Sequence, residues 1–123
     1  MNCEDMSDFE INKRALHFAI ASGLIAYWDR TFYEYEKVFY HVGLEVKEFD
    51  PCNNPSNAWP IMMDNNIFIA PTRDDFEFKY MTKCLINGSA GLAWTSRFTS
   101  YSDNPLRAAM ICFLKMKGAE NDR

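Results

Sequence analysis

The sequence FDPCNNPSNAWPI, at residues Phe49–Ile61, is the stretch around which the rest of the chain must be arranged. It contains three of the five prolines, three asparagines, a tryptophan and one of the four cysteines. The residues before Pro51 and Pro55 are pushed out of helical geometry by the proline ring that follows them. Asn54 before Pro55 is typical of the cap and first position of a helix. The stretch therefore predicts a structural corner that contains a short helix ending before Pro60.

Ahead of this corner, the pattern of apolar residues predicts a helix over residues 8–21. Ser7 and Glu10 have the S-x-x-E spacing of a capping box. The apolar residues fall on one broad arc of the helical wheel, and only Asn12 intrudes on that arc. Gly23 is suited to end the helix.

Between this helix and the corner, the period changes to the alternation of a strand over residues 33–40. Its aromatic residues favour a strand, with one face made of Tyr33, Tyr35, Lys37 and Phe39. Gly43 can turn the chain into a second strand over residues 44–48. A single long, irregular strand is the alternative to this hairpin.

The second half has its own strand signals. A turn at Asn65–Asn66 leads into a short buried strand over residues 67–69, which Pro71 closes. Residues 76–84 alternate cleanly, and Asn87-Gly88 is a strong hairpin signal because both central residues of a type I′ turn need positive φ. A returning strand carries Leu92, Trp94 and Phe98.

The last predicted element is a helix that begins at Asn104 and Pro105, which suit the cap and the first helical position. A buried stripe follows, and Gly118 is the expected end. Together the elements predict an α+β fold in a single domain over residues 1–123. It has an N-terminal helix, an antiparallel sheet of four or five strands and a C-terminal helix packed on that sheet.

The composition excludes several classes of protein. The formal net charge is −4, and residues 1–60 contain ten acidic against five basic residues, which disfavours a nucleic-acid binder. No apolar run approaches the ~20 residues that span a bilayer. The four cysteines are widely spaced and no signal peptide precedes them, so we expect reduced thiols, a cytoplasmic protein and no membrane.

Few residues offer catalytic chemistry. Cys52 as nucleophile, His41 as base and Asp50 as orienting group can be written as a triad, because a base within reach activates a thiol. The cysteines and histidines lack zinc spacing, and the common phosphate and hydrolase motifs are absent. We therefore expect no metal, no cofactor and no catalytic residue, and keep the triad as the alternative.

Aromatic residues make up 15% of the chain and suggest either a ring-rich core or a binding face. Tyrosine and tryptophan dominate the energetics of protein interfaces. The predicted binding residues are Tyr33, Tyr35, Asn53, Asn54 and Trp59.

Three blocks of the sequence resemble the NinX-like proteins of lambdoid phages and enterobacterial prophages. They are SDFEINKRA at Ser7–Ala15, FDPCNNPSNAWPIM at Phe49–Met62 and NPLRAAMICFLKM at Asn104–Met116. The resemblance implies a phage-encoded accessory protein that is made in the cytoplasm of a bacterial host cell. It supplies no catalytic residue.

These observations predict a non-enzymatic module that binds a host or phage protein and modulates a host process or defence. Two other classes stay open. One is a small cysteine-dependent enzyme that uses Cys52, His41 and Asp50. The other is a nucleic-acid-binding module, which the charge pattern disfavours. The partner and the oligomeric state are open.

Overall fold

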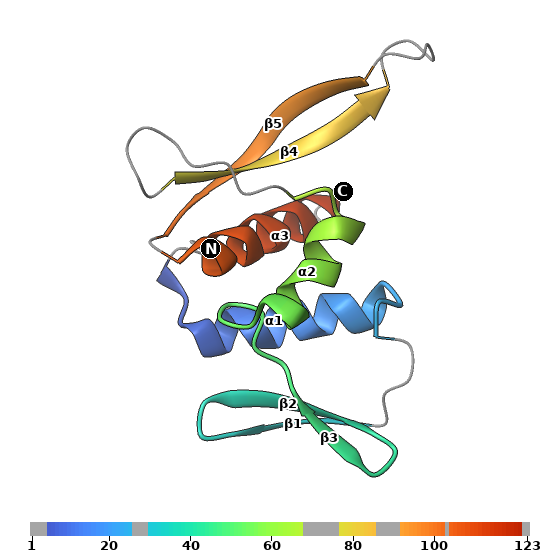
Figure 1. Ribbon diagram of the computed structural model, residues 1–123. Coiled ribbons are helices and arrows are strands. Elements are labelled where there is room, and N and C mark those ends of the chain that lie inside the picture. Colours follow the sequence, from blue (N-terminus) through green and yellow to red (C-terminus); the bar gives the residue numbers. More distant parts are fainter. Residues whose placement is uncertain (1–4, 26–29, 68–76, 86–91, 103, 122–123) are drawn as a thin grey trace.

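The computed structural model describes residues 5–25, 30–67, 77–85, 92–102 and 104–121, and it describes side chains in these ranges outside 77–101 and 119–121. In chain order the elements are α1 (Asp8–Ala21), β1 (Arg30–Glu34), β2 (Lys37–Val42), β3 (Glu45–Glu48), α2 (Pro55–Asp64), β4 (Glu77–Leu85), β5 (Leu92–Tyr101) and α3 (Pro105–Asn121). Helices and strands make the fold α+β, as predicted. Figure 1 shows the three helices as a central layer between two separate antiparallel sheets.

The strands do not form the single sheet of four or five strands that the sequence predicts. One sheet has the order β1-β2-β3 and the other contains only β4 and β5, within the described residues. The helical layer separates the two sheets, because α1 contacts β2 on one side while α3 contacts β4 and β5 on the other. Strand patterns in a sequence show where strands form, but the pairing depends on how the helices pack between them.

Helix α1 has the predicted bounds. The Ser7 hydroxyl accepts a hydrogen bond from the Glu10 backbone N–H at 3.2 Å, which is the cap that the sequence indicates. The helix ends at Ser22, and Gly23 follows in the left-handed region at φ +82°. Asn12 is buried among apolar residues, as its position on the apolar arc suggests.

The predicted strand over residues 33–40 is interrupted by a tight turn. Tyr35 and Glu36 have φ of 51° and 59°, as the two central residues of a type I′ turn require. Because a two-residue turn folds the strand back on itself, Tyr33 pairs with Val38 and lies on the opposite face from Phe39. The predicted shared face was therefore wrong. The predicted turn at Gly43 is confirmed, and it leads into β3.

Helix α2 begins where the sequence indicates but runs through Pro60 to Asp64. The Asn54 side-chain Oδ1 accepts a hydrogen bond from the Ser56 backbone N–H at 2.9 Å, and Pro55 takes the first helical position. Pro60 cannot donate to the helix, yet the turn around it is held by burial of Ala58, Ile61 and Met62. The predicted end before Pro60 was therefore wrong.

After α2, the turn at Asn65–Asn66 is confirmed, and Asn66 has φ 56°. Ile67 is buried but is not in a strand, and the rest of the predicted strand over 67–69 lies outside the described residues. Strands β4 and β5 confirm the predicted pair, with a register shift between Tyr80 and Met81. The predicted turn at Asn87-Gly88 also lies outside the described residues.

Helix α3 is more deeply buried than an amphipathic pattern implies. Seven consecutive residues, 108–114, are all buried, because α1 and α2 contact one side of the helix while β4 and β5 contact the other. A helix that is apolar all round is typical of such a central position. The predicted packing of this helix on a single large sheet is thus replaced by contacts with both helices and the two-stranded sheet. Gly118 does not end the helix, which continues to Asn121.

Replacing Gly118 should stabilise the protein. Gly118 lies inside α3. Apart from its chain neighbours and the backbone of its own helix, no atom of the described residues lies within 4 Å of the position that a Cβ would take. Glycine in a helix costs roughly 0.5–1 kcal/mol relative to alanine. We expect Gly118→Ala to raise the free energy of unfolding by about that amount in urea denaturation. A decrease would contradict the helical assignment at this position.

Candidate functional site

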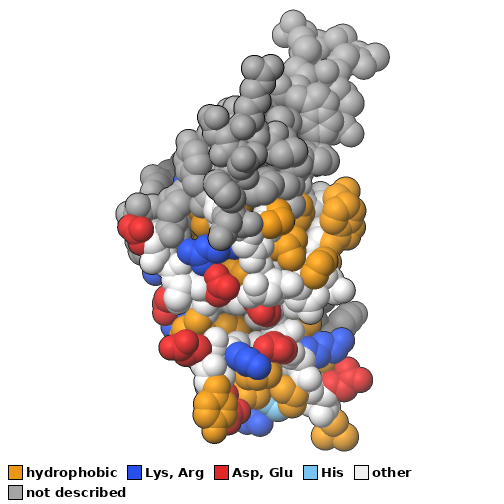
Figure 2. Space-filling view, turned by 60° about the vertical axis from the view of Figure 1, so that its left-hand side comes forward, with side chains coloured by type: hydrophobic (Ala, Val, Ile, Leu, Met, Phe, Trp, Pro, Cys, Tyr) orange, Lys and Arg blue, Asp and Glu red, His pale blue; other side chains and the backbone are white. Residues whose placement is uncertain are grey.

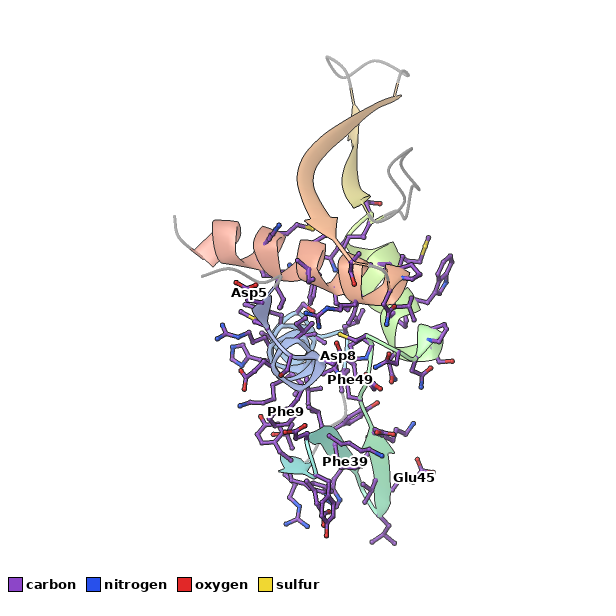
Figure 3. All side chains as sticks on the ribbon, turned by 90° about the vertical axis from the view of Figure 1, so that its left-hand side faces the viewer. Asp5, Asp8, Phe9, Phe39, Glu45 and Phe49 are labelled. Carbon is purple, nitrogen blue, oxygen red and sulfur yellow. The ribbon has the colours of Figure 1, made fainter. Side chains whose placement is uncertain are left out.

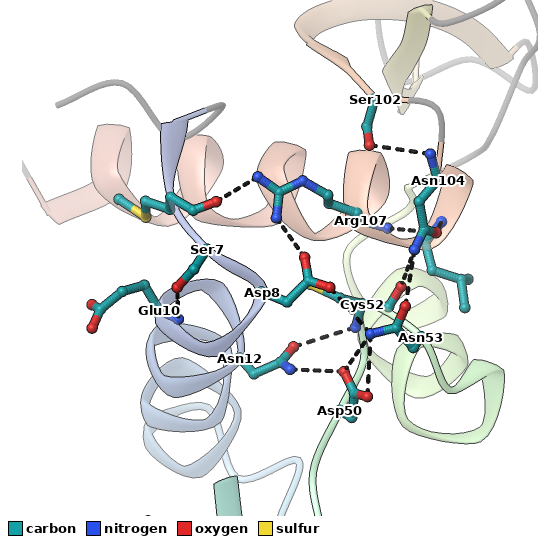
Figure 4. A network of polar contacts seen from close by, with 12 residues as sticks. Ser7, Asp8, Glu10, Asn12, Asp50, Cys52, Asn53, Ser102, Asn104 and Arg107 are labelled. Carbon is teal, nitrogen blue, oxygen red and sulfur yellow. Dashed lines mark hydrogen bonds and ion pairs between the residues drawn. The ribbon is translucent and has the colours of Figure 1, made fainter. Parts of the chain in front are cut away.

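A cluster of polar side chains joins the N-terminal ends of α1 and α3 to the corner before α2 (Figure 4). We call this cluster the polar junction. It consists of Asp8, Asn12, Asp50, Asn53, Asn104 and Arg107.

Asn12 connects α1 to the corner through both ends of its amide. Its Nδ2 donates to Asp50 Oδ1 at 2.8 Å, and its Oδ1 accepts from the Cys52 backbone N–H at 3.3 Å. The side chain is only 5% exposed. Buried polar groups must be hydrogen-bonded to be tolerated. Asn12 meets this requirement and fixes the corner against the helix.

The other half of the junction holds α3. Arg107 forms an ion pair with Asp8 and donates to the Met6 backbone carbonyl. Asn104 Oδ1 caps α3 by accepting from the N–H groups of residues 106 and 107, while its Nδ2 donates to the Cys52 carbonyl at 2.8 Å. Asn53 Nδ2 lies within hydrogen-bonding distance of both Asp8 and Asp50.

The three blocks that resemble NinX-like proteins meet at this junction. Ser7–Ala15 contributes Asp8 and Asn12, Phe49–Met62 contributes Asp50 and Asn53, and Asn104–Met116 contributes Asn104 and Arg107 (Figure 4). The polar residues of the three blocks bond mainly to one another. The junction therefore accounts for these blocks as parts of one folding unit.

The junction does not arrange Cys52 as a nucleophile. Cys52 is fully buried, and burial raises the pKa of its thiol, an effect that the nearby negative charges of Asp8 and Asp50 strengthen and Arg107 opposes. A thiol held protonated is a poor nucleophile. Asp50 is bonded by Asn12, Asn53 and, through its own N–H, Asn57, whereas His41 lies in β2 against the ring of Phe32. This environment argues against the triad that the sequence allows.

Because the Cys52 thiol is buried and protonated, it should resist alkylation in the folded protein. We expect iodoacetamide at pH 8 to leave Cys52 unmodified under native conditions and to modify it fully in 6 M guanidinium chloride. Peptide-level mass spectrometry separates Cys52 from the other cysteines. Rapid modification of Cys52 in the native protein would contradict this placement.

The predicted binding residues fall into two groups. Tyr33, Tyr35 and Trp59 are 50%, 89% and 61% exposed, so they are not core residues. Asn53 and Asn54 are also exposed, but their side chains bond within the protein, in the polar junction and at the cap of α2 respectively.

A groove runs between α1 and β1, on a different face of α1 from the polar junction. We call it the α1–β1 groove. Two adjoining hollows of about 310 and 330 Å³ form it, and they share Lys13, His17 and Tyr33. The first is also lined by Leu16, Ile20, Ala21 and Thr31, and the second by Glu10, Arg14 and Phe18. Lys13 Nζ lies 5.1 Å from the ring centroid of Tyr33, and Phe9 packs edge-on against the same ring. Figure 3 shows Phe9 on the side of α1 that faces the sheet.

Sequence reasoning identified Tyr33 but missed the rest of this groove. The predicted strand began at Tyr33, although the β-branched and aromatic residues 31–33 would have justified an earlier start. The junction residues Asp8, Asn104 and Arg107 were missed as a cluster, since they lie up to 99 positions apart in the sequence.

Neither a metal site nor a membrane segment is seen in the part of the chain that the structure describes. No three histidine, cysteine or carboxylate side chains come together there to hold a metal ion. None of the described helices has the length and apolar character needed to cross a membrane.

Comparison with known protein families gives a match over most of the chain. The family model described as bacteriophage P22 NinX matches residues 2–117. None of the curated proteins and none of the solved structures compared with the chain matches it. The matched range covers all three blocks, and it includes every residue of the polar junction and the α1–β1 groove. The chain therefore belongs to the bacteriophage P22 NinX family of phage proteins.

Proposed function

We propose that this phage protein is an accessory factor that binds a host or phage protein, without catalysing a reaction itself, and thereby modulates a host process or defence. Membership of a phage family fits an accessory role. The observation that carries the binding proposal is the exposure of Tyr33, Tyr35 and Trp59. Exposed tyrosine and tryptophan are enriched among the residues that contribute most to protein interfaces.

Tyr35 supports the proposal most directly. It is 89% exposed in the β1–β2 turn, where its φ of 51° places a bulky residue in the left-handed region. Asparagine and glycine are the residues preferred in such a turn, and strained positions of this kind cluster at functional sites. Keeping Tyr35 there costs stability and presents its ring to solvent, as expected for a residue that binds a partner.

Apolar exposure extends to other parts of the surface. Trp59 and Met63 are one turn apart on α2, and Met63 is 48% exposed. Figure 2 shows hydrophobic side chains exposed at the lower end of the molecule, which the β1-β2-β3 sheet forms, with charged side chains between them.

Replacing the strained turn should separate binding from stability. We expect the double variant Tyr35→Asn/Glu36→Gly to raise the free energy of unfolding by about 1–2 kcal/mol, because each left-handed non-glycine residue costs roughly 1–2 kcal/mol. The same variant should lose most partner binding. Loss of binding in a more stable protein cannot be caused by unfolding.

The test is affinity capture with the tagged full chain from phage-infected host cells, with quantitative mass spectrometry of the captured proteins. We expect the wild type to capture a partner protein in stoichiometric amount, and the Leu44→Ala variant to capture the same amount. The Trp59→Ala variant and the double variant Tyr35→Asn/Glu36→Gly should each reduce the amount of captured partner at least tenfold. Leu44 is the matched control because its apolar side chain is fully exposed in the next turn. If the wild type captures no stoichiometric partner, the proposal fails.

A further inference from the structure

The α1–β1 groove has one wall made by a sheet edge. In the order β1-β2-β3, the strand β1 is at the edge, and no other described strand pairs with its outer side. Proteins commonly protect such edges with proline, bulges or inward-pointing charges. The residues of β1, RTFYE, include no proline, and their pairing with β2 is continuous, without a bulge. This edge is therefore able to accept a further strand.

The register identifies which backbone groups point outward from β1. Glu34 and Lys37 flank the two-residue turn and form a hydrogen-bonded pair, and such pairs alternate along an antiparallel hairpin. Thr31 and Tyr33 are then in the non-hydrogen-bonded positions, so their N–H and C=O groups point away from β2. These are also the two β1 residues that line the groove.

The side chains of the groove indicate the chemistry of the segment that would fit. Leu16, Ile20 and Ala21 line one section, which suits an apolar side chain. The adjoining section carries Lys13 and Arg14, and Arg14 has no ion pair among the described residues.

The charge of the α1–β1 groove differs in sign from the net charge of the whole chain. The net charge of the chain is −4, yet these two cationic side chains face only Glu10 among the carboxylates that line the groove. Glu10 already pairs with Lys13 at 3.5 Å. Charge complementarity therefore favours an acidic segment.

We propose that the α1–β1 groove binds an extended, acidic segment of a partner protein, which adds as a strand to the edge of β1. The backbone of the segment bonds to Thr31 and Tyr33. One apolar side chain enters the section lined by Leu16 and Ile20, and a carboxylate lies near Lys13 and Arg14. In strand addition of this kind, main-chain hydrogen bonds supply affinity and pockets for alternate side chains supply specificity. This inference rests on the proposed protein-binding function and assigns it a surface.

The test uses a library of random decapeptides selected against the full chain, followed by fluorescence anisotropy with the enriched peptides. We expect the selection to enrich acidic peptides in which an apolar residue and an acidic residue occupy alternate positions. Two peptides are then compared, one methylated at the backbone nitrogens of the odd-numbered residues and the other at those of the even-numbered residues. One of the two should lose binding and the other should keep it, because only every second N–H of an added strand points toward β1. Selection that enriches no peptide, or only peptides without acidic residues, overturns the inference.

Two proline variants provide a matched pair. Thr31→Pro removes an outward N–H from β1 without breaking its pairing with β2, since proline is tolerated at the outer side of an edge strand. Val46→Pro makes the same change on β3, whose outer side forms the other edge of the sheet. We expect Thr31→Pro to weaken peptide binding at least tenfold and Val46→Pro less than twofold. Equal effects overturn the inference.

Charge reversal and self-association complete the test. Lys13→Glu should weaken the binding of acidic peptides at least fivefold, and an unchanged affinity overturns the assigned charge preference.

If the chain alone sediments as a dimer that Thr31→Pro dissociates, the occupant of the groove is a second copy of the chain, and the proposed partner segment is wrong. If partner capture from cells survives Thr31→Pro, the groove assignment fails while the protein-binding function stands. If the wild type captures no partner, that function fails.

Discussion

Replacing Asn12 by alanine should lower the free energy of unfolding by about 3–4 kcal/mol. The substitution removes the donor to the Asp50 carboxylate and the acceptor for the Cys52 N–H. A buried donor left without a partner costs roughly 1–3 kcal/mol, and a lost hydrogen bond to a charged group roughly 1.5–3 kcal/mol. Urea denaturation followed by circular dichroism measures the change. Because small domains have a total stability of only about 5–15 kcal/mol, such a loss is large.

Two further variants test the reason for this loss. Arg14→Ala changes an exposed residue of the same helix and should alter the stability by less than about 0.5 kcal/mol. Asn12→Asp keeps an acceptor for the Cys52 N–H but places a second carboxylate against Asp50, so it should destabilise the protein most at neutral pH. If Asn12→Ala and Arg14→Ala have equal effects, the junction does not stabilise the fold.

The sequence predicted the features of this fold that depend on local chemistry. Ser7, Asn54 and Asn104 were recognised as helix caps because a short polar side chain before a helix bonds to its free N–H groups. Asn12 was recognised as an intruder on an apolar face, but its partners were not, because they lie 38 and 40 positions away. A single sequence shows that a buried amide needs partners without showing which ones it has.

The errors arose where tertiary contacts override local preference. Tyr35 and Glu36 are poor type I′ residues, so their pattern was interpreted as a continuous strand. Pro60 and Gly118 usually end helices, but α2 continues through Pro60 to Asp64 and α3 continues through Gly118 to Asn121. The assignment of the described strands to two sheets depends on α3, which packs against β4 and β5.

The candidate site was predictable in part for the same reasons. Trp59, Tyr33 and Tyr35 were identified by residue type, and all three are exposed. The α1–β1 groove was not predicted, because it depends on the position of one edge strand relative to a helix and on the direction of its backbone groups. The polar junction and the groove lie on different sides of α1, so variants in one should leave the other intact.

Replacing Asn104 by alanine should lower the free energy of unfolding by about 2–4 kcal/mol. The side chain caps α3 through the N–H groups of Leu106 and Arg107, and it donates to the carbonyl of the buried Cys52. Loss of a cap costs about 0.5–2 kcal/mol, and a buried carbonyl without a donor adds roughly 1–3 kcal/mol. Since α3 contacts both other helices and the second sheet, fraying at its start is expected to loosen the whole centre.

Asn104→Ser separates the two contributions. Serine can cap the helix, but it is too short to replace the 2.8 Å hydrogen bond to the Cys52 carbonyl. We therefore expect the serine variant to lose about half as much stability as the alanine variant, in the same urea titrations. Equal losses would mean that the link to the corner, and not the cap, is the whole contribution of Asn104. A loss confined to the alanine variant would mean the reverse, and this end of α3 would then be held by its cap and by the Arg107–Asp8 pair with α1.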